Sequence, residues 1–269
     1  MDMPPQLLER ARAVVYGGLW TPPATRPAAT VVLLRDGPDG IEVALLQKSA
    51  HLGFARGMYV FPGGAVDAAD AASGDPWLIA AIRETFEECG VLLTDPNPRE
   101  DVQAYRAQEF AQVLAQLKVR PAVESLHPFS HWITPEVESR RFDTKFFATR
   151  LPVGQDLAGL TDEHQAIGWF RPEQTSGLPM LPPTAAVLAE LATFGTVEQA
   201  LAPQRQPVPI MPRPIPVDDQ ELGIDWVLVN GHTGQPLLPI SWRCPAVSAH
   251  GRAVVSAAGR AFSRVTRAR

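Results

Sequence analysis

Two segments decide the fold of this chain, Phe61-Pro62-Gly63-Gly64 and Arg83-Glu84-Thr85-Phe86-Glu87-Glu88-Cys89-Gly90. In a helix, which turns about 100° per residue, the three glutamates of the second segment fall within one arc roughly 100° wide. Apolar side chains line the opposite side of such a helix: Ile79, Ile82, Phe86, Cys89 and Leu93. This spacing predicts a short helix that packs on one face and ends at Gly90. Its other face is predicted to present Glu84, Glu87 and Glu88 to a single point.

The acidic face has two interpretations. A solvated surface accounts for three glutamates by themselves, although like charges at this spacing destabilise a helix by roughly a few tenths of a kcal/mol per pair. A hard divalent cation, which prefers oxygen ligands, would reverse that penalty. The preceding sequence favours the cation, because residues 58–61 form a β-like run and Gly63-Gly64 allows a close approach of the backbone. Two further acids, Asp67 and Asp70, follow at once.

These residues resemble the Nudix box, the signature of hydrolases that act on nucleoside diphosphates linked to another moiety. The box is Gly, five residues, Glu, seven residues, and then Arg-Glu-aliphatic-any-Glu-Glu-any-Gly-aliphatic. This chain has Gly64, five residues, Asp70, twelve residues, and then Arg83 through Val91. It departs from the pattern by Asp in place of the first Glu, by five extra residues before the helix, and by Thr85 at the aliphatic position. The Asp keeps the charge, the longer loop adds little closure entropy, and the methyl group of Thr85 can still pack.

A longer resemblance points to one branch of this family, the animal peroxisomal coenzyme A diphosphatases of the nucleoside diphosphate-linked moiety X motif 19 type. It covers roughly residues 20–200, and the stretches that carry it are 25–34, 61–70, 81–93 and 140–147. Coenzyme A hydrolases also have a pattern upstream of the box, and the residues that fit it here are Leu45, Leu46, Ser49, Gly57 and Phe61 to Gly64. Lys48 and Gly53 stand where that pattern has two arginines.

The resemblance implies an α/β fold, a Nudix-type α/β/α sandwich with a mixed sheet. A helical insertion after the Nudix helix and a C-terminal extension would be added to it. We therefore expect an N-terminal arm at residues 1–24 and a Nudix hydrolase domain at 25–201, with the insertion at about 97–126. Residues 202–269 would form a Pro-rich extension with a hairpin and a basic tail.

Local patterns predict the individual elements. Strands are expected at residues 28–35, 41–47, 129–134, 141–149 and 166–170. Helices are expected at residues 5–16, 99–118, about 121–126, and 182–193. Thr184 has the character of an N-cap for the last helix. The recurring prolines of residues 202–217 predict a polyproline-like linker or an arm laid over the domain, and a hairpin is expected around Asn230-Gly231.

The box and the loops near it supply the candidate site residues. Mg²⁺, or Mn²⁺, is expected at the metal ligands Glu84, Glu87, Glu88 and the backbone carbonyl near Gly64. The expected catalytic residues are Glu87, Glu84, Arg83 and Glu163, where Arg83 would pair with a box carboxylate. Glu163 would act as the base or a further metal ligand, or else be a plain loop carboxylate, and His164 is expected at the surface. The expected substrate-binding residues are Lys48, Arg56, Phe61, Gly63 and Asp67.

The site predicts a Mg²⁺-dependent hydrolase that cleaves the diphosphate of a nucleoside diphosphate-linked substrate. For coenzyme A or acyl-coenzyme A, the resemblance implies 3′,5′-ADP and (acyl-)4′-phosphopantetheine as products. NADH, ADP-ribose and nucleotide sugars stay open as substrates, because nothing in the box distinguishes them. A Nudix-like binding or regulatory module without turnover is the third hypothesis, and the intact triple acid with Arg83 speaks against it.

Composition bounds the partners and the compartment. The net charge of −5 argues against a nucleic-acid-binding surface. The sequence contains no run of 18 apolar residues, so we expect no membrane span. Cys89 and Cys244 are expected to be free thiols in a reducing compartment. The N-terminus does not resemble a signal peptide and the final Arg-Ala-Arg is not a peroxisomal Ser-Lys-Leu address, so we expect a cytoplasmic protein. The expected partner is a small-molecule nucleotide substrate, and the insertion could cover the site or form a homodimer surface.

Overall fold

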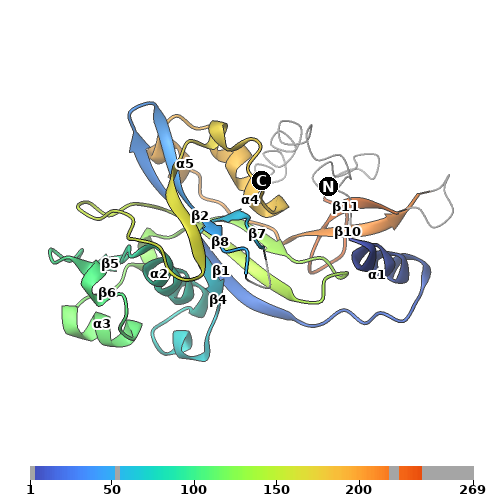
Figure 1. The fold of residues 1–269 in the computed structure, drawn as a ribbon, viewed down its shortest axis with the longest axis horizontal. Coiled ribbons are helices and arrows are strands. Elements are labelled where there is room, and N and C mark those ends of the chain that lie inside the picture. The colour runs from blue at the N-terminus through green and yellow to red at the C-terminus, as the bar shows by residue number, and fades with distance from the viewer. Residues whose placement is uncertain (1–3, 52–54, 218–223, 238–269) are drawn as a thin grey trace. The chain divides into compact units, whose positions relative to one another are not determined.

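The chain divides into two compact units of contacting residues. The structure is a computed structural model that describes residues 4–51, 55–217 and 224–237 (Figure 1). Of the described residues, the first unit comprises 4–27, 130–144, 207–217 and 224–237, and the second comprises 28–51, 55–129 and 145–206. The two units are described separately below.

Antiparallel strand pairs place the glycine segment in the second unit. β1 (Thr25–Gly37) and β2 (Gly40–Lys48) form a hairpin in which Gly37 pairs with Gly40 across a two-residue turn. β2 also pairs with β3 (Tyr59–Val60) and with β9 (His164–Phe170). The short strand β4 (Gly63–Ala65) pairs with the start of β1, so that Gly64 lies opposite Ala29. β8 (Arg141–Arg150) is the other neighbour of β1.

The predicted acidic helix is α2 (Pro76–Cys89), and its boundaries follow from its end residues. Asp75 caps the first turn, because its side chain accepts a hydrogen bond from the backbone N–H of Trp77. Pro76 occupies the first position, where its missing N–H has no partner to lose. Gly90 ends the helix in the left-handed conformation, at φ 70°, which confirms the predicted end.

The apolar face of α2 forms the core of the second unit. Phe86, Ile82 and Cys89 are completely buried among side chains of β1 and β2, such as Leu33 and Leu46. Leu93 is buried in the same core but lies beyond the end of the helix. Thr85 is also buried, and its hydroxyl donates to the carbonyl of Ala81 one turn earlier. The hydroxyl at the aliphatic position of the box is therefore satisfied inside the helix.

The segment after α2 differs from its prediction. A single helix over residues 99–118 was expected, but the structure has a 3₁₀ turn, η2 (Val102–Tyr105), followed by α3 (Phe110–Leu117). The expected second helix near residue 121 is only the 3₁₀ turn η3 (Val123–Ser125). β5 (Thr94–Asp95) and β6 (Arg120–Pro121) pair at the base of this insertion and lie beside α3 in Figure 1.

The chain completes the second unit after β9. A 3₁₀ turn, η4 (Pro172–Thr175), precedes α4 (Pro182–Leu191) and the short α5 (Val197–Leu201). Thr184 does not cap α4 as predicted: the helix begins at Pro182 and Leu181 is the cap residue, so Thr184 is buried within its first turn.

The first unit contains α1 (Pro5–Tyr16), β10 (Ile210–Pro216) and β11 (Ile224–Asn230), together with residues of β7 (His127–Ile133) and β8. α1 has the predicted bounds and lies beside β10 in Figure 1. β10 is antiparallel to β11 over its whole length and pairs in parallel with β7 only at Ile210 and Trp132. The order in this unit is β11-β10-β7-β8, and the parallel pair makes the sheet mixed, as predicted.

Residues 210–216 of the proline-rich segment form the strand β10, which corrects the predicted linker or arm for this part of the segment. Pro212, Pro214 and Pro216 alternate along β10. Successive N–H groups of a strand point to opposite edges, and the backbone N–H of Gly231 donates to the carbonyl of Pro209 across the β10–β11 pair. The backbone N–H groups of residues 211, 213 and 215 therefore point toward β11. Residues 212, 214 and 216 point to the other edge, so the N–H groups that proline lacks there are not needed for pairing with β11. The same missing donors explain why the pairing with β7 stops after one residue pair.

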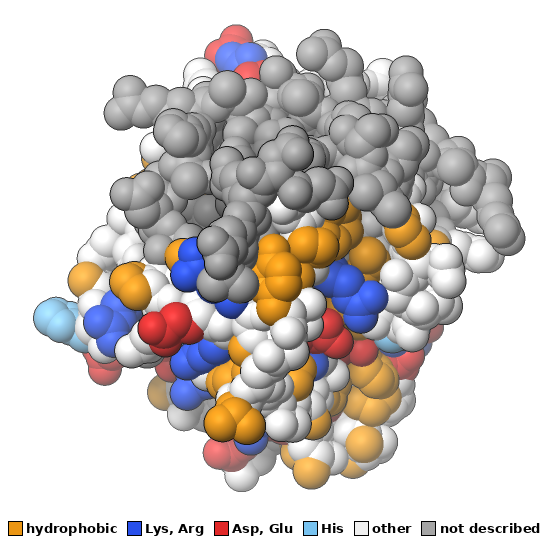
Figure 2. Space-filling view, turned by 90° about the vertical axis from the view of Figure 1, so that its right-hand side faces the viewer, with side chains coloured by type: hydrophobic (Ala, Val, Ile, Leu, Met, Phe, Trp, Pro, Cys, Tyr) orange, Lys and Arg blue, Asp and Glu red, His pale blue; other side chains and the backbone are white. Residues whose placement is uncertain are grey.

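The predictions about nucleic-acid and membrane partners concern the charges on the molecular surface and the length and polarity of the helices. Side chains of both charge signs are interspersed with hydrophobic ones on the face shown in Figure 2. In the described parts of the chain, every helix is too short or too polar to cross a bilayer.

Candidate active site

The glycine segment and the acidic helix are in direct contact. The backbone N–H of Gly63 donates to Oε2 of Glu88 at 2.8 Å. A Cβ atom on Gly64 would lie 2.4 Å from Oε1 of Glu84, so this carboxylate rests directly on the backbone of the segment. A Cβ atom on Gly63 would lie 2.4 Å from the carbonyl oxygen of Ala29 on β1. Only glycine at both positions allows the helix, the segment and β1 to approach this closely.

Arg83 holds the acidic side chains together. Its Nε and Nη2 atoms donate to the two oxygens of Asp70 at 2.9 and 3.0 Å, while Nη1 donates to Glu84 at 2.8 Å and to Glu87 at 3.2 Å. Nη2 also donates to the carbonyl of Ala65 at 3.0 Å. Burial disfavours the charged guanidinium, but its bonds to Asp70 and the nearby charge of Glu84 outweigh burial and raise the pKa of Arg83. The pairing of Arg83 with box carboxylates is thus present in the structure.

Asp70, the residue in place of the first box glutamate, lies in a short 3₁₀ turn. This turn, η1 (Ala68–Ala72), has Asp67 as its cap residue, and the backbone N–H of Asp67 donates to Oδ2 of Asp70 at 2.8 Å. Asp70 is only 2% exposed, whereas the Asp67 side chain is exposed and lies 3.8 Å from Nη2 of Arg83. The turn before the extra residues of the box therefore delivers a buried carboxylate to Arg83.

Glu88 is surrounded by basic groups. Nζ of Lys48 and Nε2 of His164 lie 3.3 and 3.2 Å from its Oε1 atom. The pKa of Glu88 is lowered, because these two groups and the Gly63 N–H outweigh the effect of burial. A β-bulge between Gln47 and Lys48 shifts the pairing of β2 and β9, so that Lys48 lies opposite His164. Bulges re-aim side chains in this way next to functional sites.

His164 corrects a prediction, since it was expected at the surface and is only 4% exposed. Its Nδ1 atom is hydrogen-bonded to the hydroxyl of Thr161 at 2.8 Å. Its Nε2 atom faces Glu88 but lies outside the angles of a hydrogen bond. The sequence carries no signal for this position, because the contact depends on where β9 begins and on the bulge in the pairing of β2 with β9.

The helical arc predicted that the three glutamate side chains point to one place, and in the structure they do not. Among the described residues, three possible metal-binding atoms lie within 4.8 Å of one another only in a histidine-containing group elsewhere. The physical reason is that the carboxylates are drawn to different cations. Glu84 and Glu87 share Arg83, and Glu88 is held by Lys48 and Gly63.

The two glutamates on Arg83 have unusual acidity. Burial, with smaller contributions from the charges of Glu88 and Glu87, raises the pKa of Glu84 to about 7 despite Arg83. Burial also raises the pKa of Glu87, again against the effect of Arg83. The Glu84 side chain is 16% exposed and that of Glu87 is 43% exposed. The site thus brings together more carboxyl groups than its own cations could neutralise.

This surplus of oxygen donors fits a hard divalent cation. Mg²⁺ prefers carboxylates, backbone carbonyls and water as ligands, and the site brings Glu84 and Glu88 against the glycine segment with Glu87 at its open side. A bound cation would stabilise the ionised form of Glu84, which burial now disfavours. The donor set therefore supports the predicted cofactor.

The remaining predicted residues lie at different depths. The Glu163 side chain is exposed, with Oε2 3.7 Å from Nζ of Lys48, so the loop before β9 reaches the site. Arg56 is exposed in the turn before β3. Phe61 is 3% exposed and its ring packs edge-on against Phe146. The visible role of Phe61 is therefore in the core, and its part in substrate binding stays a prediction.

Arg106 was not predicted as part of the site. It lies just after η2 and donates from Nε to the carbonyl of Glu87 at 2.8 Å, from Nη2 to the carbonyl of Glu88, and from Nη1 to the carbonyl of Gly159 at 2.5 Å. The last carbonyls of a helix have no partner within it, so Arg106 fixes the end of α2 that carries two of the glutamates. As a residue of an expected continuous helix, it gave no sequence signal for this role.

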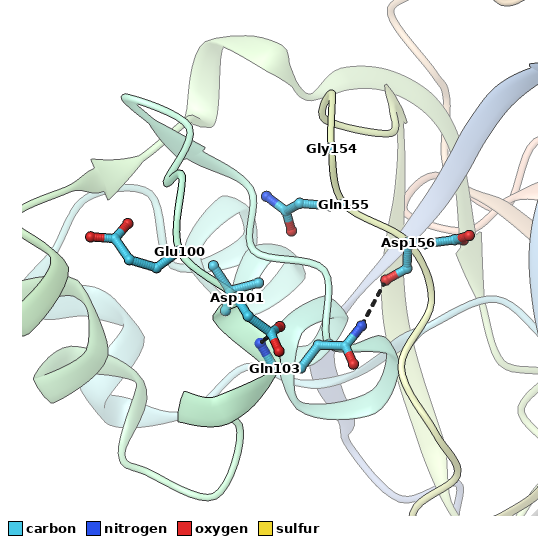
Figure 3. Close-up of a pocket in the computed structure, with 8 residues that line it drawn as sticks. Glu100, Asp101, Gln103, Gly154, Gln155 and Asp156 are labelled. Carbon is cyan, nitrogen blue, oxygen red and sulfur yellow. Dashed lines mark hydrogen bonds between the residues drawn. The ribbon is translucent and has the colours of Figure 1, made fainter.

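A small pocket lies at the same end of α2, beside Gly90. Figure 3 shows Gln103 and Asp156 on its wall, joined by a hydrogen bond of 3.3 Å from the Gln103 amide to the Asp156 carbonyl. Its cavity of about 60 Å³ is far below the roughly 300–1,000 Å³ of small-molecule sites. The pocket therefore does not hold a nucleotide in this conformation.

Three comparisons place these features among known proteins. A sequence model of the NUDT19 Nudix domain matches residues 76–178. The chain is 27% identical to the human acyl-coenzyme A diphosphatase NUDT19 over 272 aligned positions, which cover 72% of this chain and 71% of that protein. It is 30% identical to the putative nudix hydrolase 7 of Caenorhabditis elegans, covering 66% of this chain and 68% of the relative.

A solved structure supports the fold. The crystal structure of a Nudix hydrolase from Alicyclobacillus acidocaldarius superposes with a TM-score of 0.58 and 27% identity, covering 69% of this chain and 98% of that one. This similarity, the worm relative and the matched domain indicate the same family as the glycine segment, Arg83 and the acidic helix do. The chain belongs to the Nudix hydrolase family.

Proposed function

We propose that this chain is a Mg²⁺-dependent diphosphatase, and that its substrate is coenzyme A or acyl-coenzyme A. The observation that carries the proposal is the Glu84 carboxylate, which is buried against Gly64 with a pKa raised to about 7. A buried acid in this state is stabilised by a cation, and a diphosphate needs a cation for its own neutralisation. Mn²⁺ would serve in place of Mg²⁺.

The metal ligands of the proposal are Glu84, Glu87, Glu88 and the backbone carbonyl of Gly64. A cation held there would neutralise the diphosphate oxygens and increase the acidity of a bound water. Arg83 positions Glu84 and Glu87, because one guanidinium contacts both carboxylates while it is anchored to Asp70. Such positioning of ligands is a common requirement of metal sites.

The other residues would act on water and substrate. Glu163 would accept a proton from the attacking water as the new bond to phosphorus forms, and the bridging P–O bond would break to give two phosphomonoesters. Lys48, which lies 3.3 Å from Glu88 and 3.7 Å from Glu163, would neutralise a phosphate oxygen. Arg56 and Asp67 would contact the substrate from the exposed side, and Gly63 would contribute backbone near the diphosphate.

The choice of coenzyme A rests on the similarity to NUDT19. The human relative is named for acyl-coenzyme A diphosphatase activity and aligns over most of both chains, and the matched domain includes α2 and Glu163. Cleavage of coenzyme A by this chain would yield 3′,5′-ADP and 4′-phosphopantetheine. The cationic Lys48 keeps a positive charge at a position where the coenzyme A pattern has arginine.

Substrate identity and catalysis can be tested together. The protein would be incubated with coenzyme A, NADH and ADP-ribose in Mg²⁺, and the products would be identified by mass spectrometry. We expect coenzyme A to be cleaved to 3′,5′-ADP faster than NADH or ADP-ribose is cleaved. Glu87→Gln should lower the rate of coenzyme A cleavage by a factor of about 100 or more, as the loss of one electrostatic group in an active site does. The exposed Glu198→Gln on α5 is the matched control and should keep the native rate.

The outcomes separate the hypotheses. Faster cleavage of NADH or ADP-ribose would reassign the substrate and leave the chemistry intact. Binding of a nucleotide without turnover by the native protein would identify a regulatory module. Equal rates for the native and Glu87→Gln proteins would refute the assignment of Glu87.

A further inference from the structure

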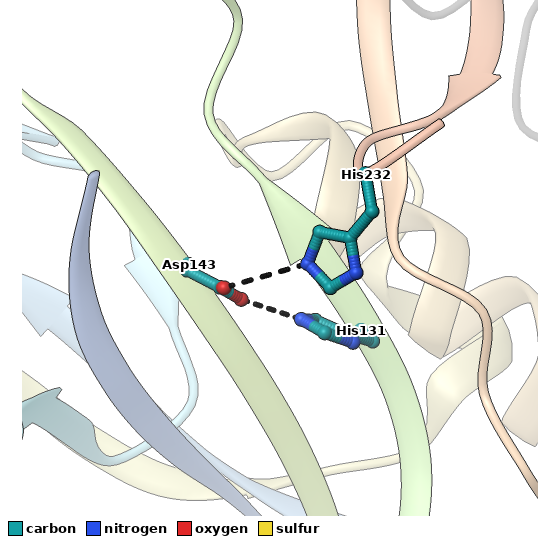
Figure 4. Close-up of side chains that lie close together, drawn as sticks. All are labelled: His131, Asp143 and His232. Atoms are coloured by element: carbon teal, nitrogen blue, oxygen red, sulfur yellow. Dashed lines mark hydrogen bonds and ion pairs between the residues drawn. The ribbon is translucent and has the colours of Figure 1, made fainter. Parts of the chain in front are cut away.

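A group of side chains of the types that bind metals lies in the first unit and shares no residue with the acidic helix. His131 is on β7, Asp143 is on β8 and His232 follows β11. One oxygen of Asp143 is 2.5 Å from Nε2 of His131, and the other is 3.8 Å from Nε2 of His232. Figure 4 shows the carboxylate facing both imidazoles. One donor atom from each residue lies within 4.8 Å of the others.

Hydrogen bonds within the turn after β11 fix the backbone at His232. The side-chain oxygen of Asn230 accepts hydrogen bonds from the backbone N–H groups of His232 and Thr233 at 3.0 and 3.1 Å. The backbone N–H of Gly234 closes the turn on the Asn230 carbonyl at 2.7 Å. The His232 ring then stands edge-on to the His131 ring, with centroids 5.8 Å apart. The second imidazole is thus placed by local backbone structure.

We propose that His131, Asp143 and His232 bind Zn²⁺. Two imidazole nitrogens and one carboxylate oxygen are a donor set that Zn²⁺ accepts and that Mg²⁺, which prefers oxygen ligands, does not favour. An ion pair with Asp143 would need only one histidine. The arrangement instead gives each carboxylate oxygen its own imidazole nitrogen.

The observed distances suit a tetrahedral ion after small side-chain movements. Ligand atoms about 2.0–2.1 Å from zinc are roughly 3.3 Å apart in a tetrahedron. The distance of 2.5 Å between Nε2 of His131 and Oδ1 of Asp143 must increase, and Nε2 of His232, now 3.8 Å from Oδ2, must move toward the carboxylate oxygen that binds the ion. The His232 side chain is 60% exposed and has room to move. Three protein ligands leave a fourth position for water.

Binding would join three segments that are far apart in the sequence. Zinc would link β7, β8 and the turn after β11, and a ligand that binds only the folded state stabilises it. The site would therefore stabilise the first unit, and this proposal does not depend on catalysis by the acidic helix.

The test is a titration of the full chain with ZnCl₂ in millimolar Mg²⁺, which keeps the oxygen-rich site occupied. Calorimetry should show one zinc bound per chain that is lost in His232→Ala. Removal of a residue that only hydrogen-bonds a ligand lowers metal affinity about 10- to 100-fold, so removal of a ligand should lower it by about 100-fold or more. Co²⁺ in place of zinc should give the visible spectrum of a tetrahedral ion in the native protein only.

Two further variants keep the result decisive. Asp143→Asn preserves side-chain size and should weaken zinc binding to a similar extent, while the exposed His51→Ala should bind as the native protein does. His232 is exposed, so its variant should keep the native circular dichroism. Native affinity in both His232→Ala and Asp143→Asn, or no micromolar zinc binding by the native protein, would overturn the proposal.

Discussion

At the scale of single residues, the raised pKa of Glu84 makes folding depend on pH. The folded protein holds a proton on Glu84 up to about pH 7, whereas the unfolded chain releases it near the usual 4.5. The folded state therefore binds more protons between these values, and the free energy of unfolding falls as pH rises from about 4.5 to 7. The full difference in pKa corresponds to at most about 3 kcal/mol.

The prediction is measured by denaturant unfolding in EDTA at pH 5 and pH 8. Glu84→Gln should lose less stability than the native protein between these two conditions, because it lacks the ionising group. Glu9→Gln, on the exposed side of α1, is the control. The same pH dependence in Glu84→Gln and the native protein would contradict the burial of an ionisable Glu84.

Alanine substitutions of the two glycines in the glycine segment are expected to have different effects, one on stability and one on activity. In Gly63→Ala the new methyl meets the backbone of β1, including the Ala29 oxygen at 2.4 Å, so stability should fall by about 1–3 kcal/mol, as overpacking does. In Gly64→Ala it meets the end of the flexible Glu84 side chain at 2.4 Å. This variant should therefore stay folded but lose at least about tenfold in activity.

Melting temperature and turnover, measured on both glycine variants, separate these effects. A fully active Gly64→Ala protein would show that the contact between Glu84 and the glycine segment is unimportant for catalysis.

Residues within one local pattern could be predicted from the sequence. Glu84, Glu87 and Arg83 follow from the period of a helix, and their contacts bear out the pairing. The environment of Glu88 could not be predicted, because Lys48 reaches it through a bulge and His164 through the start of another strand. The prediction that all three carboxylates converge was wrong because it also depended on distant residues. Helical spacing fixes the direction in which each side chain leaves the helix, but not the cations that draw the carboxylates apart.

At the scale of elements, Arg106 ties the segment after the box to the end of α2. Arg106→Ala would leave the carbonyls of Glu87, Glu88 and Gly159 without these donors. Hydrogen bonds from a charged group are worth about 1.5–3 kcal/mol each, so we expect a loss of about 2 kcal/mol or more. Hydrogen exchange in the last turn of α2 should accelerate.

Arg120→Ala is the matched control for Arg106. Arg120 is also an arginine of the insertion, but it makes exposed ion pairs with Asp95 and Glu124, and such pairs contribute little. Unchanged hydrogen exchange of α2 in Arg106→Ala would show that the helix end is held by other contacts.

Elements with a strong period were predicted well, and elements decided by tertiary contacts were not. α1 and α2 follow from apolar spacing, and α2 from its glycine end as well. The predicted helix over residues 99–118 is broken where Arg106 turns toward α2. β10 was missed because prolines argue against a strand, and only the neighbouring β11 shows that their missing donors are not needed.

At the scale of the whole molecule, each unit carries one proposed metal site. A metal that binds only the folded state stabilises the unit that holds it. Hydrogen exchange should therefore slow in residues 76–91 when Mg²⁺ is added, and in residues 127–133 and 224–234 when Zn²⁺ is added. Mg²⁺ should lose its effect in Glu84→Gln, and Zn²⁺ should lose its effect in His232→Ala.

Protection of both regions by either metal alone would contradict two separate sites. The second group could not be predicted from the sequence, because residues 131, 143 and 232 have no metal-binding spacing and meet only through the sheet and the turn after β11.

The central claim is that a divalent cation binds between α2 and the glycine segment. The most direct measurement is the anomalous difference density of crystals grown with Mn²⁺. We predict a peak bonded to carboxylate oxygens of Glu84 and Glu88 and to the backbone carbonyl of Gly64. Density in which these side chains keep their contacts with Arg83 and Lys48 while Mn²⁺ binds elsewhere, in a protein that still cleaves its substrate, would contradict it.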